Sequence, residues 1–108
     1  MNVPANLKYS SDHEWCRIEG DVAVIGITDF AQSQLGDIVF VDVPTVGETL
    51  PAGEVFGTIE AVKTVSDAFL PVGGEIVEFN DAVDADPSIV NKDVYGEGWL
   101  VKVKMSDP

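Results

Sequence analysis

The residues that could do chemistry in this sequence are few, and their spacing argues against catalysis. The chain has one histidine, His13, and one cysteine, Cys16. Because they lie three positions apart, an extended strand directs their side chains to opposite faces, so they do not form a Cys–His catalytic pair. No motif supplies the base and the charge-stabilising group that a hydrolase or transferase needs. We therefore expect a buried Cys16, a half-exposed His13 and no catalytic residues.

The sequence supports metal chemistry no better than catalysis. A single His and a single Cys cannot provide the three or four ligands of a zinc site. The acidic stretch 81–86 suggests a calcium loop, but an EF-hand counted from Asp81 needs Gly at its sixth position and Glu at its twelfth. The chain has Asp86 and Lys92 there. We interpret the stretch as solvated acids in a loop and expect no metal site.

One lysine stands apart from the other basic residues. Lys63 is the only Lys or Arg between Arg17 and Lys92. It lies where two strand-like stretches meet without Gly or Pro, which predicts a tight hairpin turn of ordinary residues. Gly47 and Gly74 bracket it in the sequence. A solvated surface lysine is the simpler interpretation for most lysines, but a lysine at the apex of two half-sheets is typical of a domain that holds a covalently attached arm.

Length and composition limit the classes of protein. The chain has 108 residues, of which 45% are hydrophobic and 23% charged, which suits one domain with its own core. Its net charge of −13 disfavours nucleic acid and anionic membrane surfaces as partners. No run approaches the roughly 20 apolar residues that span a bilayer, and one cysteine excludes an internal disulfide framework.

The elements that must position Lys63 are short strands separated by glycine and proline. Strand-like stretches cover residues 22–27, 38–43, 54–62, 63–70, 75–79 and 99–104. Thr28 predicts the start of a helix over 29–35, and Asp86 with Pro87 predicts one helical turn through residue 90. Many short strands with few helices indicate a small β sandwich or barrel.

An ordered set of motifs resembles the H proteins of the glycine cleavage system, a family of lipoyl carriers. The set comprises Leu7-Lys-Tyr9, His13-Glu-Trp15, Gly26-Ile-Thr-Asp29, Leu35-Gly-Asp-Ile-Val-Phe-Val41, Glu60-Ala-Val-Lys63, Ser66-Asp67, Gly74-Glu75, Val90-Asn91 and Gly98-Trp99. The resemblance implies a mostly β, barrel-sandwich hybrid fold of the lipoyl/biotinyl-carrier kind with a few short helices. It implies one domain over 1–108 with a carrier core at about 22–104.

The same resemblance implies a cofactor and partners. Lipoate would be joined to Lys63 through an amide by a lipoyl-attaching enzyme. The arm would carry the aminomethyl group of glycine from the decarboxylase (P protein) to the aminomethyltransferase (T protein). Dihydrolipoamide dehydrogenase (L protein) would reoxidise it. Catalysis would belong to these partners, and we expect the carrier to be a monomer.

The cargo on the arm would end in a primary amine, which is cationic near neutral pH and would be held by a nearby carboxylate. Glu14 and Asp67 are the candidates, with Asp12 a weaker third, and plain solubility is the competing interpretation for these acids. Members of the family often have His where this chain has Phe30, so any role of that imidazole is absent here.

Four alternatives stay open. A biotinyl carrier usually has methionines beside its lysine, whereas Val62 and Thr64 flank Lys63. A lipoyl domain of an acyltransferase complex usually has Asp before the lysine and Ala- and Pro-rich linkers. A lipoate relay protein or an unmodified acidic interaction module would fit the sequence too. The opening residues lack the Arg-rich pattern of a mitochondrial presequence, so we expect a bacterial cytoplasmic protein. A processed matrix protein with a cloning Met would look the same.

Overall fold

A computed structural model describes residues 7–10 and 13–106. In these residues it has nine strands and three short helices. The elements are β1 (Lys8–Tyr9), β2 (Glu14–Glu19), β3 (Val22–Ile27), α1 (Asp29–Leu35), β4 (Ile38–Asp42), β5 (Thr49–Leu50), β6 (Val55–Ala61), β7 (Val65–Phe69), β8 (Gly74–Phe79), α2 (Asp81–Ala85), α3 (Ile89–Lys92) and β9 (Val101–Met105).

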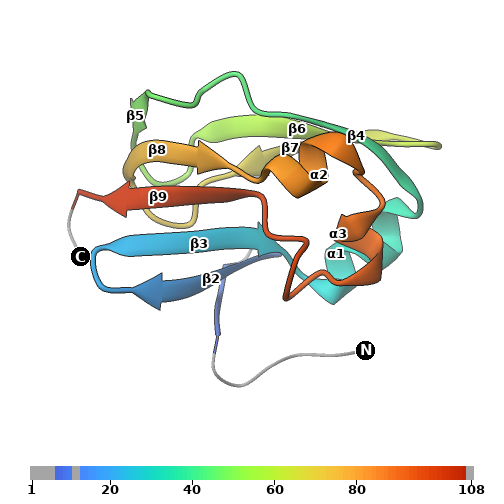
Figure 1. Cartoon of the computed structure of the whole chain (residues 1–108), viewed down its shortest axis with the longest axis horizontal. Coiled ribbons are helices and arrows are strands. Elements are labelled where there is room, and N and C mark those ends of the chain that lie inside the picture. Colours follow the sequence, from blue (N-terminus) through green and yellow to red (C-terminus); the bar gives the residue numbers. More distant parts are fainter. Residues whose placement is uncertain (1–6, 11–12, 107–108) are drawn as a thin grey trace.

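The strands form two antiparallel sheets. The larger sheet has the order β1-β2-β3-β9-β8-β5, and the smaller has the order β4-β6-β7. Figure 1 shows the sheets as two layers, with the helices gathered at one end and the β6–β7 turn projecting beyond that end. The predicted mostly β architecture with a few short helices is confirmed.

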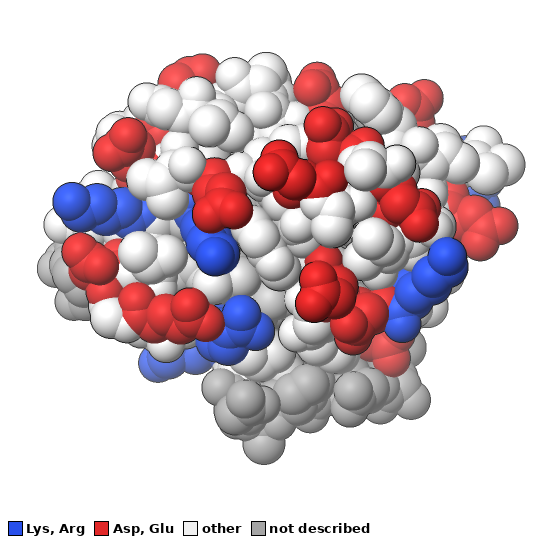
Figure 2. Space-filling model, in the orientation of Figure 1, with Lys and Arg blue, Asp and Glu red and all other residues white. Residues whose placement is uncertain are grey.

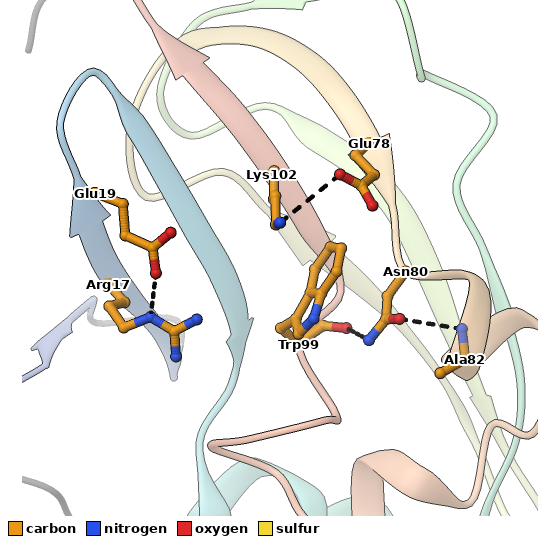
Figure 3. A network of polar contacts seen from close by, with 7 residues as sticks. All are labelled: Arg17, Glu19, Glu78, Asn80, Ala82, Trp99 and Lys102. Carbon is orange, nitrogen blue, oxygen red and sulfur yellow. Dashed lines mark hydrogen bonds and ion pairs between the residues drawn. The ribbon is translucent and has the colours of Figure 1, made fainter.

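The core lies between the two sheets and is built from alternating strand residues. In β9, Val101 and Val103 are buried while Lys102 and Lys104 are not, as the alternation of that segment predicts. The strand begins at Val101 and not at Trp99. Trp99 is half-buried. Lys102 lies over its ring, with Nζ 4.9 Å from the ring centroid, and pairs with Glu78 on β8 (Figure 3).

Helix α1 begins and ends as the sequence predicts. Thr28 precedes it, and the Oγ1 of Thr28 accepts a hydrogen bond from the backbone N–H of Ala31 at 3.2 Å. Gly36 ends it with φ +78°, a left-handed conformation that suits glycine. The hydroxyl of Tyr95 accepts from the backbone N–H of Asp29 at 2.9 Å, which fixes the start of α1 against the C-terminal part of the chain.

The acidic stretch 81–86 is mostly a helix, so its interpretation as a loop is wrong. Asn80 caps α2 by accepting from the backbone N–H of Ala82 at 3.1 Å (Figure 3). Its Nδ2 donates to the carbonyl oxygens of Glu97 and Trp99 at 2.7 and 2.8 Å. Asp81 and Asp84 then stand in the first turn, where carboxylates interact favourably with the helix dipole, and Asp86 is the C-cap residue.

The helical turn predicted through residue 90 begins later and runs further. Helix α3 covers Ile89–Lys92, with Ser88 before it. Asp86 still contributes, because its Oδ1 accepts from the backbone N–H and the hydroxyl of Ser88 at 3.2 and 2.6 Å. Among the helices described, none is long and apolar enough to cross a membrane.

The packing of Trp15 on Gly26 gives a test of the core. Trp15 is fully buried, and its Nε1 donates to the carbonyl oxygen of Val94 at 2.9 Å. A Cβ at Gly26 would lie 2.6 Å from Nε1 and Cε2 of that indole, so Gly26→Ala must displace the ring. We expect it to lower the free energy of unfolding by about 1–3 kcal/mol in urea titrations.

Gly20→Asn is the matched control for this change. Gly20 has φ +67° with open space around its Cα, and Asn tolerates that conformation. The control should be close to neutral. Equal losses in the two variants would contradict the proposed contact between Trp15 and Gly26.

The buried thiol gives a second test. Cys16 is 4% exposed, as predicted, and burial raises its pKa, with Lys8 acting in the opposite direction. The thiolate is the reactive form, so the folded protein should resist alkylation. We expect iodoacetamide at pH 8 to label the native chain at least about tenfold more slowly than the denatured chain, by mass spectrometry. Equal rates would contradict the placement of Cys16.

Candidate functional site

Lys63 stands in the turn that joins β6 to β7, which confirms the predicted hairpin. The backbone N–H of Ala61 donates to the carbonyl oxygen of Thr64 at 2.8 Å and closes the turn. The N–H of Val62 donates to the carbonyl oxygen of Asp37 at 3.1 Å and ties the turn to the loop after α1. Lys63 itself is exposed, so its amine is accessible to a large partner.

The stem of Lys63 lies against the C-terminal end of α1. A Cβ added at Gly36 would be 3.5 Å from the Cε of Lys63. That is an ordinary van der Waals distance, so Gly36 ends the helix and the lysine side chain passes close to it. This contact places the amine at one end of α1, a helix that also lines a cavity.

Asn91 on α3 fixes the loop that carries these contacts. Its Oδ1 accepts from the backbone N–H of Ile38 at 2.9 Å, and its Nδ2 donates to the carbonyl oxygen of Gly36 at 2.8 Å and to the Oε1 of Gln32 at 3.0 Å. The amide thus joins the end of α1 to the start of β4. In the sequence, Asn91 stood out only as part of a motif that resembles the family, because its neighbours do not show which groups its side chain would hydrogen-bond.

A cavity of about 170 Å³ lies between α1, β7 and the start of β2. Its lining residues are His13, Glu14, Ile27, Phe30, Ala31, Gln34, Leu35, Ile59, Ser66, Asp67 and Ala68. Glu14 and Asp67, the two carboxylates singled out from the sequence, therefore line one cavity although they are far apart in the chain. Asp12, the third candidate, lies outside the described residues.

The two carboxylates have different environments. Glu14 is 3% exposed, and its Oε1 accepts a hydrogen bond from the hydroxyl of Ser10 at 2.5 Å. Asp67 is exposed on β7, one of the two edge strands of the smaller sheet. The cavity thus has a buried, oriented carboxylate in its wall and a solvated one at its margin.

Two aromatic rings lie beside Glu14 at the cavity, and sequence reasoning missed this pairing. The rings of His13 and Phe30 have centroids 4.7 Å apart at an interplanar angle of 49°. His13 is exposed rather than half-exposed and has φ +64°, the left-handed region that few non-glycine residues adopt. Because β2 starts after this turn, no strand alternation relates His13 to Cys16.

The bracketing glycines do not lie at the turn. Gly47 donates from its backbone N–H to the carbonyl oxygen of Ile76 at 2.7 Å, and Gly74 pairs with Leu50. Both therefore belong to the β5–β8 edge of the larger sheet, whereas Lys63 belongs to the smaller sheet. They shape the fold at a distance from the lysine.

Comparison with known proteins agrees with this geometry. The profile of the family described as Glycine cleavage H-protein matches residues 7–108. The glycine cleavage system H protein of Bacteroides thetaiotaomicron is 68% identical over 107 residues, which cover 99% of this chain and 85% of that protein. The same-named protein of Bacteroides fragilis is 70% identical over 104 residues, covering 96% and 82%.

A solved structure shows the same fold. The crystal structure of a glycine cleavage system H protein from Mycobacterium marinum superposes with a TM-score of 0.90 at 45% identity, covering 96% of this chain and 87% of that one. The chain therefore belongs to the glycine cleavage H-protein family.

Proposed function

We propose that this chain is the lipoyl carrier of a glycine cleavage system and that Lys63 is its attachment residue. H proteins of this family carry lipoate covalently on a lysine and are carriers without catalysis of their own. They work with the P, T and L proteins of the system. The observation that supports Lys63 most directly is its exposure at the β6–β7 turn.

Lipoate supplies a dithiolane that accepts the aminomethyl group left by glycine decarboxylation and keeps it available for transfer. The residues of this chain present, shelter and orient that group. The turn holds the Lys63 amine away from the core, through the bond of Val62 to Asp37 and the contact with Gly36. Acylation removes one cation, so the net charge changes from −13 to −14.

The cavity beside α1 is where we propose that the loaded end of the arm rests. It is partly apolar, with Ile27, Ala31 and Leu35 in its wall, and it holds the two carboxylates. A cationic amine placed there would form a charge-assisted bond with Glu14 or Asp67. Glu14 is pre-oriented by Ser10, so we propose that it binds the amine more strongly than Asp67 does.

The acidic surface suits recognition by basic partners. Figure 2 shows Asp and Glu side chains spread over one face, with basic side chains confined to a few places. Such a surface accelerates encounter with positively charged docking sites and makes the rates depend on salt. The bacterial sources of the relatives support a bacterial cytoplasmic carrier.

The first functional prediction concerns the site of attachment. Incubated with a lipoate–protein ligase, lipoate and ATP, the chain should gain one lipoyl group, which peptide mapping places on Lys63. Lys63→Arg should remain unmodified because arginine offers no acylable amine, whereas Lys92→Arg should behave as the parent does. An adduct on Lys92 or Lys102 would contradict the assignment.

The second concerns the cavity carboxylates. Glu14→Gln should make the loaded carrier release formaldehyde and ammonia several-fold faster than the parent, because a charge-assisted bond to the amine is lost. Asp67→Asn should have a smaller effect, since solvent screens an exposed carboxylate. Formaldehyde trapping and ammonia assays measure both.

Glu48→Gln is the control, because Glu48 is exposed and does not line the cavity. Oxidised forms of all three variants should be reduced by the decarboxylase at nearly the parental rate. Retention of the cargo for as long as in the parent would contradict the proposed cavity. If the variants instead lose activity first at the decarboxylase step, these acids act in docking to the decarboxylase.

A further inference from the structure

An exposed apolar surface surrounds Lys63. Val39, Phe40, Val62 and Val65 are 51%, 48%, 75% and 61% exposed, respectively. We call these four residues the tip patch. Figure 1 shows the hairpin tip projecting beyond the rest of the molecule, and Figure 2 shows white atoms at that end, flanked by acidic groups. An apolar surface grouped around a modified residue is typical of a protein contact.

A bulge in β4 produces part of this exposure. Ile38 pairs with Ala61 and Phe40 pairs with Glu60, so two steps on β4 match one step on β6. Val39 is therefore an extra residue, and the bulge allows two consecutive apolar side chains, Val39 and Phe40, to reach solvent. A regular strand would direct one of the two toward the core.

Cross-strand pairing continues this surface to the hairpin tip. Glu60 pairs with Phe40 on one side and with Val65 on the other, so the three side chains form one row across the outer face of the smaller sheet. In the next row on the same face, Thr58 lies between Asp42 and Asp67. The exposed carboxylate of Glu60 thus lies within the tip patch, and Asp42 and Asp67 border it.

We propose that the tip patch is the docking surface for the enzyme that attaches lipoate to Lys63, an inference that rests on the proposed function. In the attachment step the Lys63 nitrogen bonds to the carbonyl carbon of an acyl adenylate. The carbon–oxygen bond to the phosphate breaks, AMP leaves with the electron pair, and the nitrogen loses its proton to solvent or to the enzyme.

The reach of lysine makes contact with the tip patch unavoidable in this step. The amine is carried on a four-carbon stem, so the reacting carbonyl must come close to the hairpin turn itself. Val62 adjoins Lys63, and Val65 lies two residues after it. An enzyme whose active site encloses the amine therefore covers these residues and the neighbouring Phe40, and the acidic border calls for a basic rim on that enzyme.

The enzymes that later use the arm need not bind in this way. After acylation the reactive end is separated from the Cα of Lys63 by both the lysine stem and the lipoyl chain. An enzyme that acts on that end can do so without covering Phe40 or Val65. The tip patch should therefore matter for attachment and much less for reduction of the finished arm, and this difference identifies its occupant.

The test uses Phe40→Ser, Val65→Ser and Val62→Ser, with Ile18→Ser and Val77→Ser as controls. The control residues are 42% and 43% exposed on β2 and β8 of the larger sheet. Each full-length chain is incubated with a lipoate–protein ligase, lipoate and ATP, and attachment is followed by intact mass. Fully lipoylated samples are then reduced by dihydrolipoamide dehydrogenase with NADH. Thermal unfolding checks that each variant is folded, and Val62→Ser provides a change in the turn outside both strands.

We expect the three tip-patch variants to lose about tenfold in attachment rate at limiting carrier concentration. The controls should stay within about twofold, and reduction of the finished arm should change less than about twofold in every variant. Attachment at the parental rate in the folded tip-patch variants would overturn the proposal. Equal losses in attachment and reduction would overturn it too, because the patch would then serve arm-using enzymes as well. A parent chain that accepts no lipoate at Lys63 would instead overturn the proposed function, and this inference with it.

Discussion

The side-chain amide of Asn91 holds together the segments on which the site depends. It bonds the end of α1 at Gly36 and the start of β4 at Ile38. The intervening Asp37 accepts the N–H of Val62 in the hairpin turn. Each such bond contributes about 1 kcal/mol net, and leaving a buried backbone group without its partner costs about 1–3 kcal/mol. The position of the lysine is therefore set from the C-terminal part of the chain, through a loop that belongs to neither sheet.

The carboxylates at the cavity are separate from the one thiol of the chain. Glu14 is buried and oriented by Ser10 in the wall of the cavity, whereas Asp67 remains in solvent. The one thiol of the chain, Cys16, is buried with a raised pKa. A thiolate attacks disulfides by exchange, so a buried thiol with a raised pKa competes poorly for the dithiolane of the arm. The fold thus supplies charge near the cavity without supplying a competing nucleophile.

Local signals in the sequence predicted the elements that depend on local interactions. Thr28 and Gly36 marked the ends of α1 because capping is decided within one helical turn. The hairpin at Lys63 followed from the meeting of two strand-like stretches. The resemblance, and not spacing, singled out Glu14 and Asp67 as possible neighbours of the arm.

Features that depend on distant partners could not be predicted in the same way. Helix α2 had a local signal that was overlooked, because Asn80 caps it through the N–H of Ala82, and only the carbonyl groups of Glu97 and Trp99 that orient Asn80 are distant. The pairing of His13 with Phe30 depends on the left-handed turn before β2. Gly47 and Gly74 were wrongly connected with the hairpin, because a sequence does not show which sheet a turn belongs to.

The bulge in β4 has a consequence for self-association. β4 is an edge strand of the smaller sheet, and an apolar edge strand is a template on which strands of other chains can extend the sheet. The extra residue Val39 interrupts the regular spacing of donors and acceptors along that edge. The chain can therefore expose Val39 and Phe40 while offering a poor template for main-chain pairing, which lowers the tendency of a small protein with an apolar edge strand to aggregate.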